Sequence, residues 1–327
     1  MLTAFNYYEP EEEHRIQKGM KENSLFEQEL KLAERFTKKH AKSAVRRTSC
    51  VVCGSNKLMH FYEKWGVEYL RCADCSSIVA DVWEEDLAEY IHLKEMRELR
   101  LSDENQKIGS ENRQQRWEEL LDWLQYRTFR YCGKNTDFSI VDYGNRWRGL
   151  RQLLQESALC GKYEMRDSIL VDKEQAGNYA EKPVDMVLAL DYIQQKVKPV
   201  QFFQEVHNSL KKDGLFILGV KVGSGFDILT LRENNKNIFP YEHVLMPSKE
   251  GISIMLTQTG FELLEFTTPG TFDVNYVKAN IDGLAKDDYF MQYFFKTATP
   301  SAEADFQRFI QKSGLSSYAQ VIARRMD

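Results

Sequence analysis

Four cysteines stand in two Cys-x-x-Cys pairs, Cys50 with Cys53 and Cys72 with Cys75, and eighteen residues separate the pairs. Each pair places two thiolates on one tight turn, and two such turns can close a tetrahedron around Zn²⁺. A dithiol redox pair or disulfides are the alternatives. Disulfides are disfavoured because the acidic N-terminus lacks the apolar segment of a secretory signal, which predicts a cytoplasmic protein.

A closed four-cysteine site has no open coordination position, so we predict that its zinc is structural rather than catalytic. The segment between the pairs, residues 60–71, reads HFYEKWGVEYLR and is rich in aromatic residues. Trp65-Gly66 supplies a turn at its middle, and this pattern predicts a β-hairpin. Residues 47–82 are therefore predicted to form a zinc ribbon.

The elements around the ribbon follow from length and periodicity. At about 100–200 residues per domain, 327 residues predict about two domains. Residues 1–46 are predicted to form a helical segment and residues 83–134 a helical connector, because apolar residues recur at helical spacing in both. The net charge of −5 argues against nucleic acid as a partner, and no apolar run is long enough to span a membrane.

Residues 135–327 alternate between apolar runs and helical segments. Strands are predicted at 138–143, 184–190, 215–220, 261–266 and 318–323, with helices at 150–159, 200–210, 249–259 and 284–312. In the last helical segment we expect aromatic residues to anchor the core: Phe290, Tyr293, Phe294, Phe306 and Phe309. This alternation predicts an α/β fold with a doubly wound parallel sheet.

The chain resembles class I S-adenosylmethionine-dependent methyltransferases of a bacterial type with an N-terminal zinc ribbon. The resemblance spans residues 48–327 and rests on several segments in order: CVVCGS with RCADC, VDMVLALDYIQQKVKPVQFFQEVHNSLKKDGLFILGV, GFDILTL, IFPYEH, GISIMLTQTGFELLEFTTPGTFDV and LSSYAQVIARR. It implies a Rossmann-like, seven-stranded sheet that binds the methyl donor at the carboxyl ends of its first strands.

The predicted donor site begins where the strand at 138–143 ends. Open α/β sheets bind ligands beyond the carboxyl ends of their strands, and Asp142 and Gly144 lie there. A glycine lets backbone approach a ligand, and the helix that follows offers free N–H groups to an anion. The resemblance implies that this anion is the methionine carboxylate. It also implies an acidic residue for the ribose, with Asp167 the first candidate and Asp172 the second.

The glycine motif departs from the family pattern, because Arg146 and Arg148 replace its second and third glycines. Their side chains either occupy donor space or pair with the donor carboxylate, for which a guanidinium is well shaped. Asp191 ends the strand at 184–190. It could face the donor or the acceptor, or cap the following helix.

Methyl transfer to a hydroxyl or an acidic carbon requires a group that accepts a proton. His243 is the catalytic candidate, with Glu242 and Tyr241 as partners, because these three residues match a motif of the family. A capped or surface histidine, in a loop before the Met-Pro-Ser turn, is the plainer interpretation.

The sequence therefore predicts S-adenosylmethionine-dependent methyl transfer to a small-molecule acceptor. The resemblance suggests a sugar or a surface-polysaccharide precursor. The arginines of the donor loop support an alternative, a methyltransferase-like module that has lost catalysis and serves binding or assembly. Modification of RNA or DNA is disfavoured by the charge, and an NAD-linked enzyme is disfavoured because no G-x-G-x-x-G follows the first strand.

Overall fold

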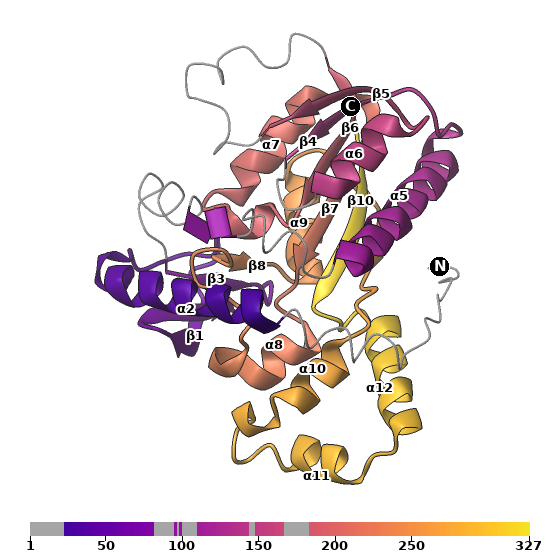
Figure 1. Cartoon of the computed structure of the whole chain (residues 1–327). Helices are drawn as coiled ribbons and strands as arrows, with labels where there is room; N and C mark the ends of the chain where they lie inside the picture. Colours follow the sequence, from indigo (N-terminus) through magenta and orange to yellow (C-terminus); the bar gives the residue numbers. More distant parts are fainter. Residues whose placement is uncertain (1–22, 82–94, 97, 100–109, 144–147, 167–182) are drawn as a thin grey trace.

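Two β-sheets organise the protein, seen here in a computed structural model that describes residues 23–81, 95–96, 98–99, 110–143, 148–166 and 183–327 (Figure 1). The larger sheet has the strand order β5-β4-β6-β7-β10-β9, and the smaller has the order β1-β2-β3-β8. The strands of the larger sheet are β4 (Phe138–Asp142), β5 (Cys160–Met165), β6 (Val184–Leu190), β7 (Leu210–Lys221), β9 (Phe261–Thr267) and β10 (Tyr318–Arg325).

The larger sheet is parallel from β5 through β7, and β10 inserts antiparallel between β7 and β9. In chain order, β4 is the first strand of this sheet, and it lies inside the sheet rather than at its edge. The next strand, β5, pairs with one side of β4, and β6 pairs with the other side. The predicted Rossmann-like α/β fold class is confirmed. The described residues supply six strands to this sheet, where the resemblance implies seven.

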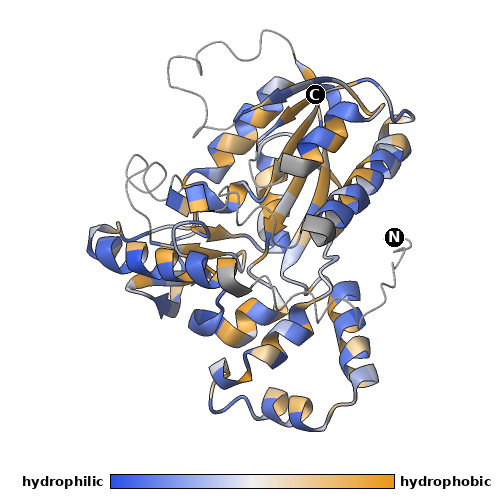
Figure 2. Ribbon diagram, viewed as in Figure 1, coloured by the Kyte–Doolittle hydropathy of each residue, from blue (hydrophilic) through white to orange (hydrophobic). Residues whose placement is uncertain are grey.

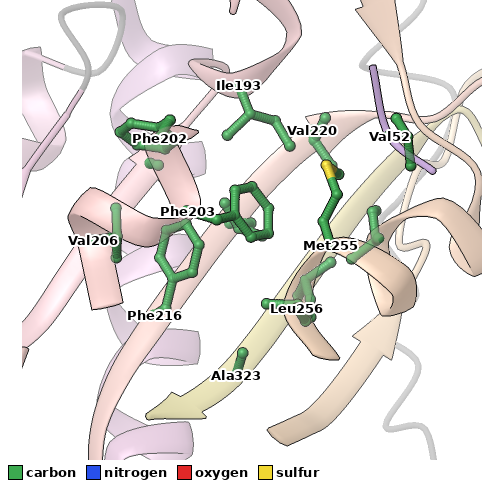
Figure 3. Packing of buried hydrophobic residues seen from close by; sticks show 14 of the residues in the cluster. Val52, Ile193, Phe202, Phe203, Val206, Phe216, Val220, Met255, Leu256 and Ala323 are labelled. Atoms are coloured by element: carbon green, nitrogen blue, oxygen red, sulfur yellow. The ribbon is translucent and has the colours of Figure 1, made fainter. Parts of the chain in front are cut away.

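Helices cover both faces of the larger sheet. On one face lie α5 (Ser110–Cys132) and α6 (Arg148–Glu156), whose Leu124, Leu150 and Leu154 are fully buried. On the other lie α7 (Pro199–Ser209) and α9 (Lys249–Gln258). Phe203 of α7 meets Phe216 of β7 there, close to Met255 and Leu256 of α9 (Figure 3).

Hydropathy explains this layering. The strands at the centre of the larger sheet are apolar, whereas the outward faces of α2 and α5 are polar (Figure 2). The central strand β6 exposes no residue, because flanking helices enclose both of its faces. Among the described residues, no helix combines the length and the apolar character that crossing a membrane requires.

The smaller sheet contains the predicted hairpin. Strands β1 (Leu58–Lys64) and β2 (Val67–Cys72) pair antiparallel, and both turn residues, Trp65 and Gly66, adopt positive φ. Such a two-residue turn matches the twist of a hairpin. Strand β3 (Ile78–Ala80) then pairs with β8 (Leu245–Met246), so the C-terminal half of the chain completes the sheet. Helix α2 (Asn23–His40) and the short turn η2 (Ala41–Ser43) belong to this unit.

A helical group lies beyond the lower ends of β7 and β10 (Figure 1). Its members are α8 (Phe226–Leu231), η5 (Arg232–Asn234), α10 (Asp273–Ala279), η6 (Ile281–Gly283), α11 (Tyr289–Thr297) and α12 (Pro300–Lys312). The predicted aromatic anchors are mostly wrong, because Phe290, Tyr293 and Phe309 are 57–70% exposed. Met291, Phe295 and Ile310 fill the core instead, on the opposite faces of the same helices.

Lys64 at the end of β1 has a buried amino group. Its side chain is 3% exposed, its Nζ donates to the Asn235 carbonyl at 2.5 Å, and it lies 4.8 Å from the centre of the Trp65 ring. Burial lowers the pKa of Lys64 from 10.5 to about 7. Above pH 7 the folded protein therefore binds fewer protons here than the unfolded chain does, so this group makes stability rise with pH.

We expect the free energy of unfolding to gain about 1–3 kcal/mol from Lys64 between pH 7 and pH 9. The measurement is urea unfolding across that range for the wild type and for Lys64→Met. The variant should lack this part of the pH dependence. An identical slope in the two proteins would contradict a neutral Lys64 in the folded state.

Candidate functional site

The carboxyl edge of the larger sheet contains the point where the strand order reverses, between β4 and β6. Ligands of open α/β sheets bind beyond the carboxyl ends of the strands at such a point. Both strands end in the same dipeptide, Asp142-Tyr143 after β4 and Asp191-Tyr192 after β6. The structure therefore brings two of the predicted donor residues to one edge.

Asp142 is held firmly at the end of β4. Its side chain is 4% exposed, and its Oδ2 accepts a hydrogen bond from the Tyr163 hydroxyl of β5 at 2.6 Å. Burial, and then the Asp142 charge, raise the pKa of Tyr163, so the hydroxyl stays a donor. The backbone oxygen of Asp142 accepts from the Arg166 N–H at 2.8 Å.

Asp191 has a left-handed backbone, with φ of 56°. Aspartate tolerates this region better than most residues, and such conformations gather at functional sites. Its N–H donates to the Gly219 carbonyl of β7 at 2.8 Å, which fixes the turn after β6. Asp191 itself is half-buried.

Sequence reasoning missed an aromatic group at this edge. The rings of Tyr143, Tyr192 and Phe202 lie 5.0–5.5 Å apart, centre to centre. Lys196 places its Nζ 4.2 Å from the centre of the Tyr192 ring. The repeated Asp-Tyr dipeptide at two strand ends is the signal that could have revealed this group.

The other predicted donor residues are only partly covered. Gly144, Arg146, Asp167 and the second ribose candidate, Asp172, lie outside the described residues. Arg148 is the first residue of α6, but its side chain is not among those described. Their roles stay predictions.

The catalytic candidates Tyr241, Glu242 and His243 are at most 5% exposed, so the interpretation of a surface histidine is wrong. Both the backbone N–H and the Nδ1 of His243 contact Phe239, the N–H donating to the carbonyl at 2.8 Å and Nδ1 lying 3.2 Å from it. The Phe239 N–H also donates to Nδ1 at 3.1 Å, so Nδ1 is placed both to accept from the Phe239 N–H and to donate to the Phe239 carbonyl. Nε2 is the proton acceptor of the ring only in the tautomer whose Nδ1–H donates to that carbonyl.

One residue separates these three residues from β8, and the segment from Tyr241 to Pro247 contacts both halves of the fold. The Tyr241 ring packs edge-on against Phe36 of α2, with 5.5 Å between ring centres. On the side of the larger sheet, Gly223, two residues after β7, donates its N–H to the Pro247 carbonyl at 3.1 Å. Strand β8 also lies beside the short turn η4 (Ile193–Gln195), which follows Asp191.

The four cysteine sulfurs gather as predicted. All lie within 4.8 Å of one another, and the Cys50–Cys75 and Cys53–Cys72 pairs are 3.6 Å apart. A tetrahedron with Zn–S bonds of 2.3 Å has edges of about 3.8 Å, so the residues fit the ion. The hydrogen bond between Cys50 and Cys75 lowers the pKa of Cys75 to about 5 and raises the pKa of Cys50, so Cys75 is the first of this pair to become a thiolate.

The two Cys-x-x-Cys turns share one backbone design. In the first, Gly54 N–H donates to Cys50 O and Cys50 N–H donates to Ser55 O; in the second, Ser76 and Ser77 make the equivalent bonds with Cys72. The residue after each pair, Gly54 or Ser76, has positive φ. This repetition makes the two turns equivalent halves of one metal site.

Ser248 links the cysteine site to α9. Its Oγ donates to the Cys75 carbonyl at 2.5 Å and accepts from the Gly251 N–H at 2.9 Å, so it caps the helix. Its own N–H donates to the Ser77 Oγ at 3.1 Å. Val52 of the first cysteine turn also reaches the main core near Met255 (Figure 3).

We expect Ser248→Ala to lower the free energy of unfolding by about 1–3 kcal/mol, because it removes a helix cap and leaves a buried carbonyl without its donor. Thermal unfolding and the rate of zinc release to a chelator measure the effect. Thr299→Ala, which removes the exposed cap of α12, is the control and should leave zinc release unchanged. Equal release from both variants would contradict the link.

Comparison with known proteins gives fold-level similarity only. No protein-family model and no curated protein matches the chain. Similar solved structures include the [4+2]-cyclase SpnF, with 16% identity, a TM-score of 0.36, and 64% of this chain and 80% of that chain covered. Coclaurine N-methyltransferase shows 14% identity and a TM-score of 0.36, with 64% and 72% covered. The plantazolicin methyltransferase BpumL shows 12% identity and a TM-score of 0.38, with 69% and 92% covered. Similarity at this level does not identify a reaction or a substrate.

Proposed function

We propose that the protein is an S-adenosylmethionine-dependent methyltransferase that acts on a small-molecule acceptor, such as a sugar or a surface-polysaccharide precursor. One observation carries the proposal: Asp142 and Asp191 lie on the two sides of the point where the strand order reverses. Their carboxylates suit a ligand that combines an ammonium, a sulfonium and hydroxyl groups.

The turn after β4 supplies the rest of the proposed donor site. Gly144 would let the backbone approach the ligand, and Arg146 and Arg148 would pair with its carboxylate. Asp167, or Asp172, would accept hydrogen bonds from the ribose hydroxyls. When bound, the donor supplies an electrophilic methyl group, and the chain must orient the acceptor in line with it.

The acceptor proton is assigned to His243. In our proposal Nδ1 carries the ring proton and donates to the Phe239 carbonyl, so that Nε2 takes the proton from the acceptor. Glu242 and Tyr241 assist from the same buried segment. Zinc at the four cysteines is proposed as a structural ion that holds the ribbon against this segment.

Titration calorimetry with S-adenosylmethionine and S-adenosylhomocysteine tests the proposal. We expect the wild type to bind both, and Asp142→Asn to bind S-adenosylmethionine about tenfold more weakly, because the charge that faces the donor is lost.

Asp185→Asn is the matched control, because Asp185 is a carboxylate of the neighbouring strand β6 but lies at the amino end of that strand, where it accepts from Ser139 and Lys211. The Asp185→Asn variant should have a lower free energy of unfolding than the wild type but the same affinity for S-adenosylmethionine. Absence of binding by the wild type at millimolar donor would favour the alternative, an inactive binding or assembly module.

A further inference from the structure

Helix α11 has apolar residues on two opposite faces. One face packs into the core of the helical group through Met291 and Phe295, which are 5% and 8% exposed. The opposite face carries Tyr289, Phe290 and Tyr293, which are 69–74% exposed. A helix that is apolar all round is normally covered on every side. The described part of the chain covers only one side of α11.

The exposed rings of α11 continue onto α12. Phe290 stacks on Phe294 with 6.2 Å between ring centres, and Phe294 meets Phe306 of α12 at 5.1 Å. Phe306 in turn stacks on Phe309 at 6.4 Å, and Phe309 is 57% exposed. These four rings form one continuous aromatic row across two helices. Helix α11 lies at the end of the helical group that points away from the larger sheet (Figure 1).

The area of this surface approaches what a dimer requires. Four of its rings are 57–74% exposed, namely Tyr289, Phe290, Tyr293 and Phe309. At roughly 200 Å² per aromatic side chain, these four present about 500 Å² to solvent. A stable protein interface covers about 800 Å² on each partner. The rings alone therefore supply more than half of such an interface, before polar residues at its rim contribute.

The order of side chains along α11 suits an antiparallel copy of the same helix. Phe290 and Tyr293 lie at equal distances on either side of one point, so a two-fold axis there places Phe290 of each copy on Tyr293 of the other. The same axis places the exposed Asp287, which precedes α11, beside the exposed Lys296 in the last turn of the other copy. One symmetry operation thus pairs aromatic rings at the centre and opposite charges at both ends.

A lipid surface fits this patch less well than a second copy does. Helices that lie on anionic membranes carry an excess of lysine and arginine beside their apolar face. The segment from Lys286 to Lys296 contains two acids and two bases, so it has no such excess. On α12, Arg308 beside Phe309 already forms an ion pair with Asp305. The balanced charge favours a protein surface with the same balance.

We propose that the exposed face of α11 and α12 is the interface of a dimer with a second copy of this chain. Helix α11 packs antiparallel against α11 of the other copy about a two-fold axis, and Phe309 of α12 lies at the edge of the interface. The proposal concerns assembly and does not rest on the proposed reaction. It is tested without donor or acceptor, so it fails or succeeds separately.

Sedimentation velocity of the full-length, zinc-loaded protein at micromolar concentrations tests the dimer. We expect the wild type to sediment with twice the 38.3 kDa mass of one chain. Phe290→Ser should raise the dissociation constant of the dimer about 30-fold or more, because it removes a central ring from both copies. Phe129→Ser is the matched control, since it removes a 59% exposed ring from α5, and it should dimerise as the wild type does.

Charge reversal tests the antiparallel arrangement. Asp287→Lys and Lys296→Asp each place like charges opposite one another in the dimer, so each should weaken it about tenfold. The double variant should recover the wild-type dissociation constant, because the two new charges again meet across the axis. Within one copy the two positions lie about 13 Å apart at helical rise, so a contact inside one chain does not explain the recovery.

Zinc content and far-UV circular dichroism check the fold, and both should match the wild type because Phe290 is 70% exposed. A wild type that sediments as a monomer throughout the concentration range overturns the proposal, as does a dimer that Phe290→Ser leaves unchanged. Failure of the double charge variant to recover overturns the antiparallel arrangement. Binding of a monomeric wild type to phosphatidylcholine–phosphatidylglycerol vesicles assigns the patch to lipid and also overturns the dimer.

Discussion

Cys75→Ser is expected to abolish zinc binding and to lower the free energy of unfolding by more than about 4 kcal/mol, since metal binding at such a site contributes folding free energy directly. Cys75 is 1% exposed and belongs to the core cluster that includes β6, β7 and α9. Loss of the metal therefore affects more than the ribbon. Zinc analysis of the purified protein and thermal unfolding are the measurements.

The destabilisation caused by Cys75→Ser should extend from the second cysteine turn to residues 238–248. The Cys75 carbonyl accepts a hydrogen bond from Ser248, and β3, which begins at Ile78, pairs with β8, which begins two residues after His243. A released second cysteine turn therefore loosens the segment that carries the catalytic candidates. Hydrogen exchange should show faster exchange at 238–248 in Cys75→Ser than in the wild type.

Two other cysteines provide the matched control. Cys132 is exposed and Cys160 is half-buried on β5, and neither belongs to the cluster of four. Cys132→Ser and Cys160→Ser should retain one zinc and unchanged exchange at 238–248. A Cys75→Ser protein that retains one zinc with wild-type stability would disprove a structural metal at this site.

Local patterns were sufficient to predict the hairpin and the two cysteine turns beside it. The spacing of the cysteines fixes two turns, and Trp65-Gly66 in an aromatic segment specifies the hairpin, because turn geometry and strand pairing there are set by neighbouring residues. The apolar runs that became β4, β6 and β7 were equally readable, since strands buried on both faces need unbroken apolar sequence.

Contacts between distant segments could not be read in this way. Ser248 and Cys75 are 173 residues apart, and β8 is a two-residue strand with no periodicity of its own. Nothing local indicates that residues after 240 complete the ribbon sheet. The same limit hid the exposed positions of Phe290 and Tyr293, because periodicity shows that a helix has an apolar face but not which neighbour covers it.

The candidate site was predictable only in part for a related reason. Strand ends locate Asp142 and Asp191, since all parallel strands finish at one edge. The hydroxyl that Tyr163 directs at Asp142, and the aromatic group of Tyr143 and Tyr192, depend on which strands become neighbours. That pairing is a property of the folded sheet.

His243→Gln is expected to lower kcat about 100- to 10,000-fold, the range that a positioned general base contributes. Glutamine keeps the size and hydrogen-bonding capacity of the side chain but cannot take up the acceptor proton. Because His243 is 2% exposed and its contacts with Phe239 fix its orientation, the substitution should leave the fold and the donor affinity within about twofold of the wild type.

Formation of S-adenosylhomocysteine from S-adenosylmethionine measures turnover, with an acceptor chosen by screening sugar nucleotides against the wild type. His60→Gln is the matched control, because His60 is exposed on β1 and pairs only with Glu68 in the described part of the chain. A loss of kcat with unchanged donor affinity assigns the proton to His243. If His243→Gln turns over at the wild-type rate, the base lies elsewhere on the carboxyl edge, and Asp191 becomes the next residue to test because its left-handed turn fixes a carboxylate there.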